Sequence, residues 1–303
     1  MPIREFFHFM HIVDDFDAAE ARYGELLSPE VYAPKHWSEF DKRWASLAVV
    51  GPDFVLEIME PSKAEADLGS PLPKFRARHG EHLHSLSWFV DQEDLAPLAR
   101  RMAAQGIRVV DPYGAVSGEG GASAQAFFTH PKDTFGQLEF QGLDPEGGYH
   151  ERDPHLSPDW SGARWRDEHP LGLERSSHYT TIVSDLERAK RFYEELLGAQ
   201  LFHEETGPDR RSAFAFVGTE SVVELAQPTD PDSRLGRDLA EHGELPHAIT
   251  FKVRDLDAAA RHIEAIGLRV LERTDDTVTI DPDDMFQAVV AFTTRRLPND
   301  PRG

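Results

Sequence analysis

The chain has 303 residues, with 54 Asp or Glu against 32 Lys or Arg, so its formal net charge at pH 7 is −22. This charge argues against a nucleic-acid partner, and the absence of cysteine excludes thiolate nucleophiles, disulfides and Cys-type metal sites. No apolar run approaches the roughly 20 residues that span a bilayer, and the first ten residues lack the apolar core of a signal peptide. We expect a cytoplasmic protein with two ordinary domains or one large barrel, and no membrane partner.

Both halves of the chain open with the same pattern. Residues 12–27 read IVDDFDAAEARYGELL, and residues 182–197 read IVSDLERAKRFYEELL, at an offset of 170. In each copy an Asp suited to a helix N-cap follows a strand-like run, and apolar residues then recur at spacings of three and four. The pattern predicts a strand that ends before Asp15 or Asp185 and an amphipathic helix that follows it.

A second pattern also occurs twice. Residues 84–110 and 247–271 each read as a strand, a helix and a Gly that leads into another strand, and HGEHLH (79–84) returns as HGELPH (242–247). The chain is therefore a tandem of two halves, each with two strand–helix–strands units. We expect domains at 1–142 and 175–296, separated by a linker at 143–174 that is rich in Pro, Gly and Asp, and a tail at 297–303.

Histidine and glutamate recur at fixed places in these units. The first strand of each unit carries a His: His8, His84, His178 and His247. The last strand of three units carries a Glu, and the fourth has Val290 in that place: Glu57, Glu139 and Glu224. A buried carboxylate is costly unless it is paired, protonated or metal-bound. Imidazole with carboxylate suits Fe²⁺, Mn²⁺, Co²⁺, Ni²⁺ or Zn²⁺, so the register predicts a metal site.

Single residues of these types are more often structural, and it is their recurrence in register that favours ligation. Five further histidines lack this register, and we expect them on the surface, in the linker or around the site: His11, His36, His79, His82 and His242.

The repeated units resemble the vicinal oxygen chelate superfamily, which includes glyoxalase I, bleomycin-resistance proteins, methylmalonyl-CoA epimerase and extradiol dioxygenases. The resemblance is strongest to the epimerases, at PLPKFRARHGEHLHSLSWFV (71–90) and FFTHPKDTFGQLEF (127–140). It implies an α+β fold in which four βαβββ modules pair into two cupped, barrel-like sheets that can hold a metal.

The resemblance also implies which residues bind the metal. The first half supplies a complete set: His8, Glu57, His84 and Glu139. The second half supplies an incomplete set, which we expect to be vestigial: His178, Glu224 and His247. If modules swapped between the halves, His178 and Glu224 would replace His8 and Glu57 beside the other two ligands.

By the same resemblance the protein is a metal-dependent isomerase or lyase. It would stabilise an enolate or enediolate of a small oxygen-chelating substrate, with Glu139 or Glu57 moving the proton. Four modules in one chain permit a monomer or a homodimer. Loops such as 28–43 and 111–125 would set the substrate specificity.

Two alternatives stay open. The first is an extradiol Fe²⁺ dioxygenase that cleaves catechol rings, although Phe127 and Phe128 stand where those enzymes carry a catalytic Tyr. The second is a metal-free binding protein of the bleomycin-resistance type. Epimerisation itself is disfavoured because Ser46 stands where the epimerases carry a further acid–base Glu.

Overall fold

The computed structural model describes residues 3–110, 116–117, 125–143 and 153–303. Most of the predicted specificity loop 111–125 and the start of the predicted linker lie outside these residues. The first half begins with β1 (Ile3–Ile12), α1 (Phe16–Leu27), β2 (Glu30–Ser38), β3 (Arg43–Val50) and β4 (Phe54–Pro61). After α2 (Pro71–His79) it continues with β5 (His82–Asp91), α3 (Gln92–Ala104), β6 (Val109–Val110), β7 (Val116–Ser117), β8 (Ala126–Thr129) and β9 (Gln137–Leu143).

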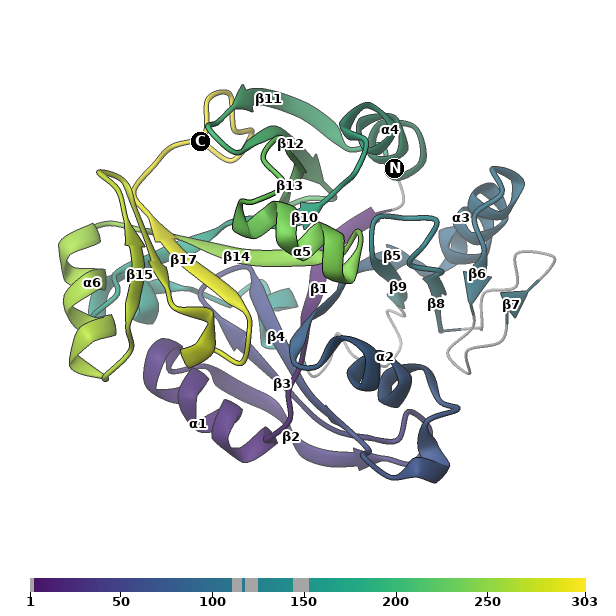
Figure 1. Cartoon of the computed structure of the whole chain (residues 1–303), viewed down its shortest axis with the longest axis horizontal. Coiled ribbons are helices and arrows are strands. Elements are labelled where there is room, and N and C mark those ends of the chain that lie inside the picture. The colour runs from purple at the N-terminus through teal and green to yellow at the C-terminus, as the bar shows by residue number, and fades with distance from the viewer. Residues whose placement is uncertain (1–2, 111–115, 118–124, 144–152) are drawn as a thin grey trace.

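The second half repeats this order (Figure 1). It begins with β10 (Leu173–Ile182), α4 (Leu186–Phe192) extended by a π-helical turn, β11 (Gln200–Thr206), β12 (Arg210–Val217) and β13 (Ser221–Pro228). After α5 (Arg234–His242) come β14 (Pro246–Val253), α6 (Leu256–Ala265), β15 (Val270–Arg273), β16 (Thr277–Ile280) and β17 (Val289–Thr293). The expected tandem of four βαβββ modules is confirmed. Asp15 and Asp185 accept hydrogen bonds from the first turns of α1 and α4, as N-caps do.

Each half forms its own sheet. Within the described residues the strand orders are β2-β3-β4-β1-β5-β9-β8-β6-β7 and β11-β12-β13-β10-β14-β17-β16-β15. Strand β1 pairs with β5, and β10 pairs with β14, in both cases antiparallel. The modules therefore pair within each half, and the swapped arrangement does not occur in this structure.

The two sheets share one hydrophobic core that draws on buried residues of both halves. Contacts across it come in pairs related by the sequence repeat. The Phe6 amide donates to Glu220 at 2.9 Å, and the Ser176 amide donates to Asp53 at 2.8 Å. In each pair a β10 or β1 amide meets an acidic residue of the hairpin turn in the other half. Such reciprocity is the signature of a two-fold relation, so the halves pack like the two subunits of a homodimer.

None of the helices in the described ranges is long and apolar enough to cross a bilayer.

The described part of the predicted linker is packed against both halves. Trp165 Nε1 donates to the Leu27 carbonyl at 2.8 Å in the first half. His155 lies buried between Asp153, at 2.7 Å, and Glu220 of the second half, at 3.3 Å. Burial alone would lower the pKa of His155, but these two carboxylates raise it to about 10. The imidazolium therefore anchors the linker by charge.

We expect His155→Gln to lower the free energy of unfolding by about 3–5 kcal/mol near neutral pH, because Asp153 then stays buried without its cation. The unfolded-chain pKa is 6.5 and the folded one is about 10. The stabilisation is therefore complete below the lower value and disappears as the pH rises through the higher one. Urea unfolding of both proteins at about pH 6 and about pH 9 checks this, and a loss of equal size at both would contradict it.

Candidate metal centre

The four expected ligands of the first half stand on four neighbouring strands. The order β4-β1-β5-β9 carries, in turn, Glu57, His8, His84 and Glu139. All four line one cavity of about 990 Å³. All four are buried, with at most 6% of each residue exposed. The sheet therefore brings together residues that lie up to 131 positions apart in the chain.

Two β-bulges set the directions of the His8 and His84 side chains. Phe6 pairs with Trp88 and His8 with Ser87, which leaves Phe7 as an extra residue just before His8. On β5, Met10 and His11 pair with Ser85 and Leu83, which leaves His84 itself as the extra residue. A bulge changes the direction of a side chain, and bulges are frequent beside functional sites.

His8 lies between the two carboxylates. Its Nε2 is 2.9 Å from Glu139 Oε2 and 3.5 Å from Glu57 Oε2. Within the described residues Glu57 Oε2 is buried and has no hydrogen-bond partner. One ring N–H cannot satisfy two carboxylate oxygens, so a buried acceptor is left facing the imidazole. A divalent cation would satisfy both oxygens and the ring nitrogen together, and the residues present therefore fit a metal.

Arg43 holds the other oxygen of Glu57. Its guanidinium pairs with Glu57 Oε1 and, at 3.1 Å, with Asp41. Burial alone would raise the pKa of Glu57, but the positive charges of Arg43 and His8 bring it below its ordinary value. Arg43 was not among the residues expected at the site. A signal existed, because Arg210 precedes Glu224 by the same 14 positions and also faces it, at 3.7 Å.

His84 presents a free ring nitrogen to the cavity. Ser85 Oγ donates to the Met10 sulfur and lies 2.8 Å from His84 Nδ1, so Nδ1 carries the proton and donates to Ser85. Burial, reinforced by the nearby positive charge of Arg43, lowers the pKa of His84 to about 3. The ring is neutral, and Nε2 has a lone pair for a metal. His84 forms no hydrogen bond or ion pair with the other three expected ligands, although it shares their cavity.

The second half retains the frame of the site, but protein groups satisfy its carboxylate. Thr180 and Ser212 hydroxyls each donate to Glu224 at 2.6 Å. Burial alone would raise the pKa of Glu224, but Arg210, His178 and these hydroxyls lower it to about 2. His178 remains 3.6 Å from Glu224. Every oxygen of this carboxylate has a protein partner, in contrast to Glu57.

The fourth position of the second half was assigned to the wrong residue. Glu139 pairs with Ser87, and the matching pair in β14 and β17 is Thr250 with Ala291. Val290 is instead fully buried in the shared core. One additional residue between the turn and β17 shifts the register by one, which moves each side chain to the other face. The place of the carboxylate is thus taken by Ala291.

Two other expectations concern neighbouring strands. Ser46 pairs with Ile58, whereas Leu47 pairs with Glu57, so Ser46 faces away from the cavity. The β3 residues that line the cavity are Arg43 and Leu47, and neither offers a carboxylate. The other expectation concerns β8, where Phe127 and Phe128 stand at the place of the dioxygenase Tyr. Of these two residues, Phe128 lines the cavity.

The five further histidines of the sequence analysis lie in different environments: His11, His36, His79, His82 and His242. His36 is exposed. His11 is fully buried between the Tyr23 hydroxyl and the Phe286 carbonyl, at 2.9 Å from each, so it lies neither on the surface nor in the linker. The remaining three gather at the junction of the halves: His79, His82 and His242.

Comparisons with known proteins agree with this architecture. Two family models, both described as the Glyoxalase/Bleomycin resistance protein/Dioxygenase superfamily, match residues 7–125 and 175–295. Lactoylglutathione lyase of Haemophilus influenzae is 31% identical over 90 residues, which cover 30% of this chain and 66% of that protein.

One solved structure shares the fold along nearly the whole chain. A variant of 4-hydroxymandelate synthase from Streptomyces coelicolor superposes on 99% of this chain and 96% of its own, with a TM-score of 0.65 and 13% identity. A methylmalonyl-CoA epimerase structure from Streptomyces coelicolor covers 40% of this chain and 96% of its own, with 30% identity and a TM-score of 0.37. With one matching model in each half and the fold shared along the whole chain, this protein belongs to the glyoxalase, bleomycin resistance protein and dioxygenase superfamily, the vicinal oxygen chelate proteins.

Proposed function

We propose that the first half is a divalent-metal enzyme that moves a proton at a carbon next to a carbonyl of a small oxygen-chelating substrate. The ion would be held by the four expected ligands: His8, Glu57, His84 and Glu139. One observation carries this proposal: the unpartnered, buried Glu57 Oε2 faces a ring nitrogen that already bonds Glu139. The lactoylglutathione lyase relative supports a lyase or isomerase reaction.

The protein's own residues divide the remaining work. A divalent ion in this place would polarise the substrate carbonyl and offset negative charge that develops on its oxygen. Glu139 is the better proton carrier of the two carboxylates. Arg43 neutralises Glu57 and lowers its affinity for a proton, whereas the ion-pair partner of Glu139 within the described residues is His8. Glu139 would take the proton from carbon and return it.

The cavity wall favours such chemistry. Met10 and Met59 belong to a buried apolar cluster against which Phe128 packs, and all three line the cavity beside the carboxylates. Apolar walls exclude water and strengthen electrostatic stabilisation of a developing oxyanion. Because β3 brings no further carboxylate to the cavity, a single acid–base group favours proton transfer on one face of the substrate over epimerisation on two.

Metal binding can be tested with the repeat as its own control. We expect His8→Ala to remove one bound ion per chain, because Glu57 and Glu139 then lose the nitrogen between them. The matched change His178→Ala, at the same position of the second half, should remove none. Elemental analysis of protein purified without added metal measures both. Equal metal content in His8→Ala and the unaltered protein would refute the site.

Glu139→Gln tests the proton carrier. We expect it to slow exchange of the substrate C–H for deuterium by about 10²–10⁴-fold, because the amide cannot accept the proton. Proton NMR in D₂O with 2-oxo acids, 2-hydroxycarbonyl compounds and acyl thioesters follows this exchange, and Glu224→Gln is the control. Iron in the purified protein with oxygen uptake on catechols would instead identify a ring-cleaving dioxygenase. Tight binding of an apolar ligand without any metal would identify a binding protein.

A further inference from the structure

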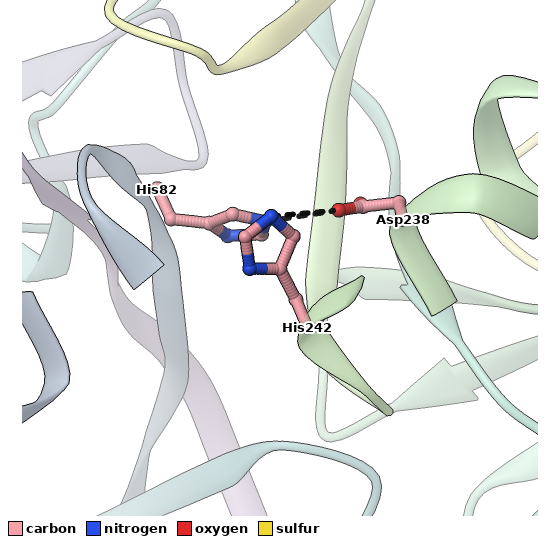
Figure 2. Close-up of side chains that lie close together, drawn as sticks. All are labelled: His82, Asp238 and His242. Atoms are coloured by element: carbon pink, nitrogen blue, oxygen red, sulfur yellow. Dashed lines mark hydrogen bonds and ion pairs between the residues drawn. The ribbon is translucent and has the colours of Figure 1, made fainter. Parts of the chain in front are cut away.

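A second cluster of metal-ligating side chains lies at the junction of the two halves. His82 begins β5 in the first half, and Asp238 and His242 lie one turn apart on α5 in the second half (Figure 2). Within the described residues these three form a group whose ligand atoms all lie within 4.8 Å of one another. His82 is buried and the other two are half-buried.

The spacing of the three ligand atoms suits a tetrahedral ion. Asp238 Oδ1 is 3.4 Å from His82 Nε2 and 3.8 Å from His242 Nε2. Bonds of about 2.0–2.1 Å to a tetrahedral Zn²⁺ place neighbouring ligand atoms about 3.4 Å apart. Small side-chain rotations would therefore bring all three atoms into coordination distance. Figure 2 shows both rings turned toward the carboxylate.

The hydrogen bonds of His82 expose the correct nitrogen. Its Nδ1 lies 2.7 Å from the Leu83 carbonyl, which can only accept, so Nδ1 carries a proton. In a neutral ring Nε2 then has a lone pair, and it faces Asp238, which is also an acceptor. Two acceptors that face each other require a proton or a cation between them.

The other two ligands also have partners on the atoms that face away from the proposed ion. His242 Nδ1 lies 3.1 Å from His79 Nδ1, and His242 Nε2 points toward Asp238. When His242 donates its Nδ1 proton to His79, its Nε2 keeps a lone pair for a metal. The second oxygen of Asp238 lies 2.5 Å from His247 Nδ1. Metal ligands typically have such outer partners, which fix the orientation of rings and carboxylates.

We propose that His82, Asp238 and His242 bind a zinc-type divalent cation that ties the first half to the second. Two nitrogens and one carboxylate oxygen are a ligand set that Zn²⁺ accepts, with water in the fourth position. The site is separate from the first-half metal centre and does not depend on the proposed function. His79 and His242 also line the cavity of the first-half centre, so the ion would fix a part of its wall.

The competing occupant is a proton. A protonated His82 beside an ionised Asp238 would form an ion pair with no metal. Burial by itself lowers the pKa of His82, but Asp238 raises it above its ordinary value. A metal would have to displace this proton, so its binding must be measured directly.

Cobalt titration of the metal-stripped full chain tests the proposal. The His8→Ala background removes the first-half site, so any remaining ion reports on the junction. We expect His8→Ala to bind one Co²⁺ per chain with the strong d–d absorption of a tetrahedral ion, and zinc to abolish that absorption by displacement. Adding Asp238→Asn or His242→Gln should remove both the absorption and the bound ion.

The proposal is overturned if His8→Ala binds no Co²⁺ at concentrations equal to the protein's, or if both further changes leave binding unaltered. In case these double variants fold poorly, a thermal measurement on single variants gives an independent reading. Zinc should raise the unfolding midpoint of the unaltered protein and of His178→Ala by the same amount, and it should raise that of His242→Gln by less, because only the first-half centre remains in that variant. An equal rise in all three would also refute the site. If His8→Ala keeps all the metal of the unaltered protein, the first-half centre fails while the junction site stands.

Discussion

Two carboxylates, Glu57 and Glu139, share one imidazole on the inner face of the first sheet, and the cost of burying them constrains the rest of the half. Neither is more than 6% exposed. An uncompensated buried charge costs several kcal/mol. Arg43 compensates one oxygen, and His8 reaches both carboxylates but can donate to one. The β1–β5 pairing, with its bulges, brings these groups together. The central strands therefore carry the free-energy cost of burying the two carboxylates.

In the second half, the equivalent buried carboxylate has a protein partner for each oxygen and needs no cation. Hydroxyls of Thr180 and Ser212 occupy the oxygens of Glu224, and Ala291 stands where the first half has its second carboxylate. The frame persists because its stability comes from the apolar core and the helix caps, which do not involve these polar residues. The fold of the second half therefore does not depend on a complete ligand set.

What the sequence could predict follows from the range of each interaction. The modules and the caps at Asp15 and Asp185 depend on local periodicity and local hydrogen bonds, and both were predictable. The Arg43–Glu57 pair depends on cross-strand register, which local periodicity does not specify, although the repeated spacing of 14 positions between Arg and Glu pointed to it. A one-residue insertion before β17 moved the assignment from Ala291 to Val290 for the same reason. His82 and Asp238 meet across 156 positions, through packing of the halves that no local pattern encodes.

The repeated hexapeptides HGEHLH and HGELPH show how the second half contributes to the cavity of the first. His79 lies 3.1 Å from His242, its counterpart in the repeat. A residue that contacts its own equivalent must lie at the axis of a two-fold relation, so the two copies face each other there. The first copy ends in His84 and supplies an expected ligand, while the second presents residues 242–245 to the wall of the same cavity. The first copy of the motif therefore supplies an expected ligand to the centre, and the second copy forms part of the cavity wall. The second half therefore contributes to the cavity through residues 242–245, even though it holds no complete ligand set of its own.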